Sequence, residues 1–148
     1  MVHHWLLSTA NVAWFCPGTE AAVKKTLDHL EGVGSQRLNV QHGFHSPCAA
    51  NVLPEYREAL EAVSMQAPSN VRFVSTVLGR EVTEEITDPD YWCKHVTGTV
   101  LYQPAVEKVH DIGGKIYVEM GPGQTLSKLA KTCLAASNLQ ELSFLPSL

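Results

Sequence analysis

Short apolar runs alternate with amphipathic segments along this chain, and this alternation limits its fold more than any other feature. Runs at 11–16, 36–40, 71–74 and 116–120 have the length and apolar content of strands, and a last one at 139–145 suits a sheet edge. Between these runs, apolar side chains recur at helical spacing. Strands that alternate with helices indicate the α/β class.

Capping and turn residues predict where the helices begin. Helices are expected after Thr19, Ser46 and Asp88, because these side chains cap helices and proline suits the first helical position. Pro54 breaks or restarts the second of them. Gly121-Pro122-Gly123 favours a tight turn from a strand into a last helix. Further expectations are a helix over 102–112, a polar loop over 81–89 and a βαβ-like or split βαβ unit over 11–40.

The composition argues against several classes of function. Hydrophobic residues make up 45% and charged residues 18% of the 148 positions, as in globular domains. The 11 lysines and arginines form no basic stripe, so no nucleic-acid partner is expected. No apolar run approaches the roughly 20 residues of a membrane span, and a signal peptide pattern is missing, so a cytoplasmic location without a membrane partner is expected. The four cysteines lack zinc-ligand spacing, which argues against a metal site.

One histidine stands where a catalytic group could be held firmly. His45 belongs to the segment 41–47, Q-H-G-F-H-S-P, between an apolar run and a helix start. The positive end of the following helix disfavours an imidazolium, which helps to keep the ring neutral and able to accept a proton. A general base is one interpretation. A histidine that merely packs at a helix entry is the other.

The sequence offers no evident nucleophile beside this histidine. It contains no G-x-S-x-G, and therefore no serine elbow of the α/β-hydrolase kind. Ser46 is adjacent but is expected to cap the helix. Cys48 lies in the first turn after Ser46 and is a weak alternative nucleophile. His95 and Trp92 share a short helix and could approach the same cleft.

Four segments, taken in order, give a family resemblance. The segment 42–47 is similar to H-A-F-H-S-P, 73–79 to v-S-N-v-t-G, 88–95 to d-p-x-Y-W-x-x-h, and 118–126 to v-E-v-G-P-g-x-x-L. These motifs belong to the malonyl/acyl-transferase domain of polyketide and fatty acid synthases, which the chain resembles over nearly its whole length. Their common order and spacing carry the resemblance, since none of the motifs is decisive alone.

The resemblance implies a partial acyltransferase fold in two parts. Residues 1–42 would be the remnant of a ferredoxin-like small subdomain, as strand, helix and strand. Residues 43–148 would be the C-terminal part of an α/β-hydrolase-like subdomain. The chain would then correspond to roughly the C-terminal half of the domain and would begin inside the small subdomain.

The resemblance also implies a reaction. In the family, a serine in G-H-S-x-G attacks the thioester of acyl-CoA, a histidine takes its proton, and the acyl group passes to the phosphopantetheine thiol of an acyl carrier protein, with no permanently bound cofactor. His45 matches this histidine, and His95 matches the residue whose backbone carbonyl fixes its ring. His42, Gly43 and Phe44 match substrate-binding positions, and a bulky aromatic at Phe44 favours malonyl-CoA.

The departures from the family pattern matter equally. The nucleophilic serine, the oxyanion-hole glutamine and the carboxylate-binding arginine have no counterpart in these residues. The polypeptide alone is therefore expected to be inactive, and its expected partners are the carrier protein and the missing N-terminal half or an adjacent synthase domain on the ketosynthase side. Two alternatives stay open: an inactive remnant that serves as a docking or structural module, and an unrelated α/β binding module.

Overall fold

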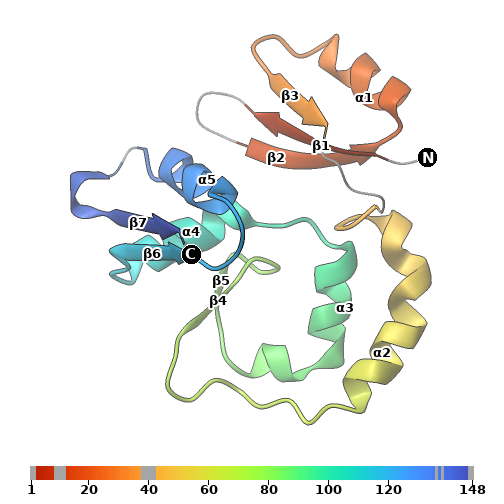
Figure 1. The fold of residues 1–148 in the computed structure, drawn as a ribbon. Helices are drawn as coiled ribbons and strands as arrows, with labels where there is room; N and C mark the ends of the chain where they lie inside the picture. The colour runs from red at the N-terminus through yellow and green to blue at the C-terminus, as the bar shows by residue number, and fades with distance from the viewer. Residues whose placement is uncertain (1–2, 9–12, 38–42, 136, 138, 147–148) are drawn as a thin grey trace.

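The structure is a computed structural model that describes residues 3–8, 13–37, 43–135, 137 and 139–146 (Figure 1). Within these residues the strands form three small sheets, and helices separate them along the chain. This mixture of helix and strand agrees with the predicted α/β class. None of the helices in the described ranges has the length and apolar character needed to cross a bilayer.

The N-terminal sheet has β1 (His3–Ser8) at its centre, with β2 (Ala13–Gly18) and β3 (Gly34–Arg37) on either side. Both outer strands run antiparallel to β1, so they are parallel to each other, and α1 (Glu20–Leu27) connects them. Because β1 lies between the two parallel strands, this is the split form of the two βαβ arrangements expected from the sequence. The strand β1 was not predicted, because two adjacent histidines open a segment without a clean alternation of apolar residues.

Helix α1 shows how local capping and burial fix an element. The side chain of Thr19 accepts a hydrogen bond from the amide of Ala22 at 3.2 Å, which confirms the predicted N-cap. Val23 is buried with 2% of its surface exposed. The helix ends at Leu27, so Leu30 lies beyond it and is 41% exposed, and the apolar face is shorter than predicted.

The segment after residue 42 begins with a tighter helix than predicted. Ser46 caps a 3₁₀-helix, η1 (Pro47–Val52), and α2 (Leu53–Glu61) follows with a proline in its first turn. The restart predicted at Pro54 is therefore confirmed. Both elements pack against α3 (Pro89–Thr97), which places the loop before η1 beside the last turn of α3 (Figure 1).

A short hairpin supports the other side of α3. Strand β4 (Phe73–Ser75) pairs antiparallel with β5 (Arg80–Val82), and a 3₁₀-helix, η2 (Glu84–Thr87), leads into α3. The prediction of a loop over 81–89 was wrong for most of its length, because β5 extends to Val82, η2 forms over 84–87 and α3 begins at Pro89. Val82 is only 2% exposed, and this single apolar anchor fixes a strand that otherwise consists of charged residues.

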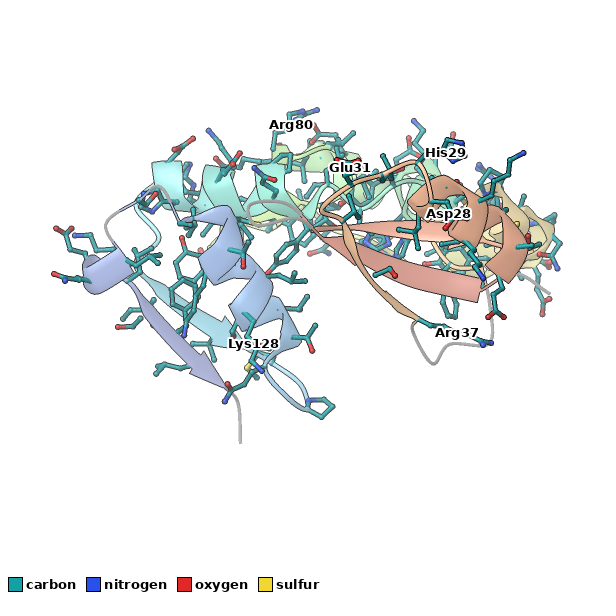
Figure 2. The ribbon with its side chains drawn as sticks, turned by 90° about the horizontal axis from the view of Figure 1, so that it is seen from above. Asp28, His29, Glu31, Arg37, Arg80 and Lys128 are labelled. Atoms are coloured by element: carbon teal, nitrogen blue, oxygen red, sulfur yellow. The ribbon has the colours of Figure 1, made fainter. Side chains whose placement is uncertain are left out.

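The C-terminal part has helices on one face of a parallel strand pair. The strands are β6 (Ile116–Glu119) and β7 (Ser143–Pro146), with a 3₁₀-helix, η3 (Leu139–Glu141), before β7. Helix α4 (Tyr102–Asp111) packs against α5 (Thr125–Cys133), and α5 contacts both strands (Figure 2). The core of this part contains Val106, Ala130 and Leu134.

The connection from β6 to α5 is the predicted tight turn. Gly121 and Gly123 have φ values of 150° and 93°, a region that L side chains rarely adopt. The carboxylate of Glu119 then accepts hydrogen bonds from the amides of Leu126 and Ser127 at 3.1 and 2.9 Å. These bonds satisfy two amides in the first turn of α5, so the turn and the helix start stabilise each other.

Candidate active site

The backbone at His45 is held in an unusual conformation. Its φ is 55°, in the left-handed region, where a non-glycine residue costs on the order of 1–2 kcal/mol. The amide of His45 donates to the carbonyl of Val96 at 2.9 Å. The next residue, Ser46, is 3% exposed and extended. A conformation with this cost persists because the surrounding contacts hold it, and the consequence is a fixed direction for the His45 side chain.

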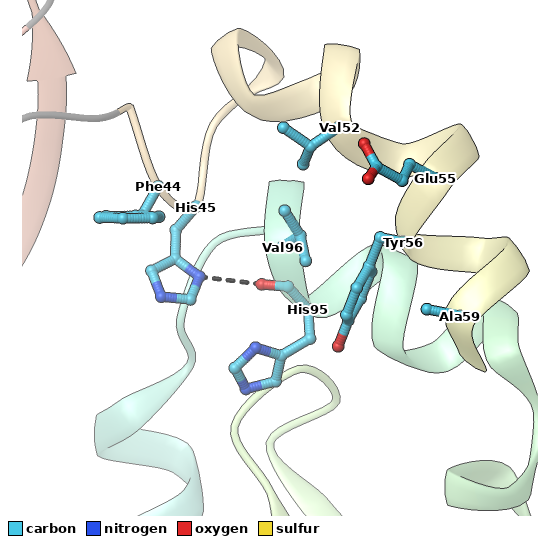
Figure 3. A pocket seen from close by; sticks show the side chains of 8 residues that line it. All are labelled: Phe44, His45, Val52, Glu55, Tyr56, Ala59, His95 and Val96. Atoms are coloured by element: carbon cyan, nitrogen blue, oxygen red, sulfur yellow. Dashed lines mark hydrogen bonds between the residues drawn. The ribbon is translucent and has the colours of Figure 1, made fainter. Parts of the chain in front are cut away.

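The imidazole of His45 contacts the other histidine that the sequence singled out. Its Nδ1 lies 2.9 Å from the backbone oxygen of His95 (Figure 3). A carbonyl oxygen can only accept a hydrogen bond, so Nδ1 carries the proton. The neutral ring must then present its lone pair at Nε2. This is the tautomer that a general base needs in order to take a proton through Nε2.

The end of α3 explains why these carbonyls accept hydrogen bonds from His45. An α-helix leaves its last four carbonyl groups without partners inside the helix. Helix α3 ends at Thr97, so the carbonyls of His95 and Val96 are among the last four. His45 satisfies the first with its ring and the second with its amide. A residue 50 positions earlier therefore caps the C-terminal end of α3.

The contact with α3 gives His45 a different electrostatic environment from the one expected from the sequence. The helix after Ser46 is a six-residue 3₁₀-helix, whereas the negative end of α3 touches the imidazole directly. Carbonyl groups at a helix C-terminus favour a positively charged neighbour. The two helix ends therefore act in opposite directions on a charge at His45, and the carbonyl of His95 is the nearer of the two influences.

Ser46 is committed to structure, as expected. Its hydroxyl donates to the carbonyl of Gly43 at 2.7 Å and accepts from the amide of Cys48 at 3.2 Å. With both its donor and an acceptor position occupied, the hydroxyl joins the loop on either side of His45. Ser46 therefore makes the loop rigid and does not act as a nucleophile in this arrangement.

Helix α3 is itself anchored by polar contacts. The hydroxyl of Tyr91 donates to Oγ of Ser75 at 2.7 Å, and Ser75 is fully buried. The indole of Trp92 donates to the carbonyl of Ile86 at 2.8 Å. Asp88 caps the helix by accepting from the amide of Asp90 at 2.8 Å, which confirms the predicted cap. These contacts fix the helix whose last turn holds His45.

The side chain of His95 packs beside His45. The two imidazole rings meet edge to face with centroids 5.5 Å apart, and the indole of Trp92 lies 6.3 Å from the His95 ring. Burial lowers the pKa of His95, and a positive charge on nearby His45 lowers it further. At neutral pH the His95 ring is therefore uncharged.

A pocket opens in front of this histidine pair. It has a volume of about 620 Å³, and α2 forms its opposite wall (Figure 3). Its lining residues are Phe44, His45, Val52, Glu55, Tyr56, Ala59, His95 and Val96. The residues of the α2 wall, from Val52 to Ala59, are three or four positions apart in the sequence, which is the spacing of one helix face. Glu55 and Tyr56 were not predicted as site residues, because a single carboxylate or tyrosine on a helix carries little signal.

The structure brings most of the predicted site residues together. Phe44 is 48% exposed, and it lines this pocket and a neighbouring one of about 410 Å³ that also contains Gly43 and Cys48. His42 lies outside the described residues. Cys48 is exposed, in contrast to the buried thiol of Cys93. No three histidine, cysteine or acidic side chains of the described ranges gather as a metal site would require.

Comparison with known proteins identifies the relatives of the chain, although no protein-family model matches it. Polyketide synthase GfsB of Streptomyces halstedii is 36% identical over 121 residues, which is 79% of this chain and 2% of that synthase. The spectinabilin polyketide synthase system protein NorB of Streptomyces orinoci is 31% identical over 121 residues, which is 80% of this chain and 6% of NorB. The chain therefore spans a small part of these synthases.

Solved structures identify which part of these synthases the chain matches. The acyltransferase domain from the second module of the salinomycin polyketide synthase matches 98% of this chain and 39% of its own, with a TM-score of 0.84 and 27% identity. The malonyl CoA-acyl carrier protein transacylase of Clostridium perfringens has the same fold, with a TM-score of 0.78 at 19% identity over 99% of this chain and 52% of its own. The chain belongs to the acyltransferase domains of polyketide synthases and represents a C-terminal portion of such a domain.

Proposed function

We propose that this chain is part of a site that loads an acyl group, malonyl in particular, from CoA onto an acyl carrier protein. His45 is the general base of this site, and the backbone carbonyl of His95 orients it. The nucleophilic serine comes from a segment outside these 148 residues. The observation that carries the proposal is the 2.9 Å contact from Nδ1 of His45 to the carbonyl of His95, because it selects the tautomer with a basic Nε2.

The chemistry follows from this tautomer. Nε2 of His45 takes the proton of the serine hydroxyl while the serine oxygen attacks the thioester carbonyl. The imidazolium then returns the proton to the departing CoA sulfur, and the acyl group stays on the serine as an ester. In the second half, the phosphopantetheine thiol gives its proton to Nε2, attacks the ester and releases the serine, which recovers the proton. The α3 carbonyl stabilises each imidazolium.

The acyl group would be selected beside His45. Phe44 lies next to His45 in the chain, and its ring lines both pockets of this region. An aromatic ring at this position leaves less room for a branch on the α-carbon of the acyl group than a small residue would. We therefore assign malonyl selectivity to Phe44, with Gly43 and His42 contributing to the same substrate-binding segment. Residues 1–42 and 43–148 are assigned to the small and the large subdomain.

The experiment joins this chain to a serine-bearing segment and follows one turnover. The acyl-enzyme formed from malonyl-CoA is measured by intact mass, and transfer to a carrier protein is measured next. His45→Ala should slow acyl-enzyme formation by about 10⁴- to 10⁶-fold, as the loss of a triad member does. His95→Ala is the matched control, because it keeps the backbone carbonyl, and it should cost less than about tenfold.

The opposite outcome favours a different function. If His45→Ala leaves both steps at the normal rate, the chain is not catalytic, and a docking or structural role in a synthase accounts for it better. The chain without a serine-bearing segment should gain no stable malonyl adduct. An adduct that maps to Cys48 would assign the nucleophile to that exposed thiol.

A further inference from the structure

A small pocket lies at the C-terminal end of α4, where the loop before β6 meets η3. It has a volume of about 220 Å³ and shares no lining residue with the pocket at His45. Its lining includes His110 of α4, Lys115 just before β6, Ser137, and Glu141 of η3. An imidazole, an ammonium group, a hydroxyl and a carboxylate therefore belong to one hollow outside the candidate active site.

The ring of His110 is the feature that points to a ligand. Its Nδ1 is buried and has no hydrogen-bond partner among the described residues. Buried polar atoms without a partner are unfavourable and rare in folded proteins. An imidazole nitrogen either donates or accepts a hydrogen bond, depending on its protonation. A ligand that offers both an acceptor and a donor would satisfy Nδ1 in either state.

The backbone on both sides of this pocket is held in place. The amide of Gly114 donates to the carbonyl of Val109 at 2.9 Å, and a Cβ at Gly114 would approach that oxygen to 2.7 Å. The loop after α4 therefore packs closely against the end of the helix. On the other side, the amide of Ser137 donates at 2.8 Å to the carbonyl of Leu134, a core residue. These bonds fix the segments that border the pocket.

Lys115 and Glu141 narrow the chemistry of the ligand. Lys115 forms no ion pair within the part of the chain that the structure describes, so its ammonium group is available to an anion. The carboxylate of Glu141 can only accept hydrogen bonds, and it repels an anion that has no proton to donate. The ligand that fits both groups is an anion with acceptor oxygens and an O–H group. Phosphate keeps an O–H near neutral pH, whereas sulfate has none.

We propose that this pocket binds free inorganic phosphate. Lys115 and Ser137 donate to its oxygens, Glu141 accepts from its O–H, and Nδ1 of His110 gains the partner that it lacks in the chain. The volume has room for the anion and a few waters, since one water occupies about 30 Å³. A phosphate monoester fits less well, because its second pKa near 6 removes the last O–H at neutral pH. This site goes beyond the proposed acyl transfer and does not depend on it.

Calorimetric titration of the chain with inorganic phosphate at pH 7 tests the site. The expected Kd is about 1 mM or lower. His110→Phe keeps an aromatic ring but removes Nδ1, and Lys115→Met removes the charge, so each should raise the Kd at least about tenfold. His29→Phe is the matched control, because His29 is exposed beyond the end of α1, and it should change the Kd less than about twofold.

A comparison of anions tests the role of Glu141. Sulfate should bind the wild type at least about tenfold more weakly than phosphate, because it cannot donate to the carboxylate. Glu141→Gln supplies a side-chain amide that can donate, so it should reduce this preference to less than about threefold. Equal affinity of the wild type for the two anions would overturn the proposal. Tighter binding of glycerol phosphate than of phosphate would overturn the choice of the free anion.

A second measurement covers the case in which His110→Phe does not fold. Nitrogen NMR of the wild-type chain should show the His110 Nδ1 resonance shifting with added phosphate, with the same Kd as calorimetry. His110→Asn keeps a polar atom near the position of Nδ1 and should bind phosphate within about threefold of the wild type. Absence of saturable binding up to about 20 mM phosphate would overturn the site and leave water as the partner of Nδ1. Binding that Lys115→Met leaves unchanged would also overturn it.

Discussion

The buried hydroxyl of Ser75 connects β4 to α3, and its removal gives a quantitative test of how the site is supported. Oγ of Ser75 accepts from the amides of Val77 and Leu78 at 3.0 and 3.1 Å and contacts the Tyr91 hydroxyl at 2.7 Å. Ser75→Ala deprives all three groups of a partner. The Tyr91 hydroxyl is buried, so leaving it without a partner should lower the free energy of unfolding by about 1–3 kcal/mol. The two unpartnered amides raise the total to about 2–4 kcal/mol.

Tyr91→Phe removes only one of these contacts. Ser75 keeps both backbone amides, so the cost should be near the net value of one hydrogen bond, about 1 kcal/mol. Urea unfolding measures both variants. With a slope of about 1–3 kcal/mol per molar, Ser75→Ala should lower the midpoint by about 1–2 M. Ser69→Ala, at an exposed turn, is the control and should change stability by less than about 0.5 kcal/mol.

The order of these effects is the critical result. The explanation requires Ser75→Ala to cost more than Tyr91→Phe, because it orphans more groups. A cost for Ser75→Ala no larger than that for Ser69→Ala would refute the assigned network, as would a larger cost for Tyr91→Phe than for Ser75→Ala. Since Tyr91 lies on the helix that ends beside His45, Ser75→Ala should also slow acyl transfer in the completed domain.

Three further predictions concern the core and the pH dependence. Leu134→Ala should cost about 2–4 kcal/mol in urea unfolding, because Leu134 is 2% exposed, whereas Leu126→Ala, at a 48% exposed position, should cost less than about 1 kcal/mol. Folding lowers the pKa of His95 from its ordinary value of 6.5. When the pH falls below 6.5, the unfolded chain therefore binds more protons than the folded chain, and the free energy of unfolding should decrease. This loss should be smaller in His95→Phe. Backbone hydrogen bonds, chiefly from the amide of Ser127, lower the pKa of Glu119, so stability should also fall below pH 4.5, its ordinary value, and Glu119→Gln should reduce that dependence in acid titrations.

Local chemistry made much of the fold predictable. The caps at Thr19, Ser46 and Asp88 all form as expected, because side-chain capping depends on residues within one helical turn. The elements that escaped prediction depend on distant partners. Strand β1 is defined by pairing on both of its edges, and β5 by one buried valine, and neither condition is visible in a short window of sequence.

The candidate site divides in the same way. The position of His45 before a capped helix was evident from the sequence, but its contact with His95 spans 50 residues and was implied only by the family resemblance. The left-handed backbone of His45 and the role of the α3 carbonyls were not predicted. They arise because a helix end and a loop satisfy each other, which is a tertiary effect.

The most direct measurement concerns the protonation of His45. Nitrogen NMR of its imidazole in the chain near neutral pH, under conditions in which the ring is uncharged, reports which nitrogen carries the proton. The hydrogen bond to the carbonyl of His95 predicts a proton on Nδ1 and a bare Nε2, unchanged in His95→Ala because that variant keeps the carbonyl. A neutral ring protonated at Nε2 would contradict the assignment of His45 as a general base oriented by α3.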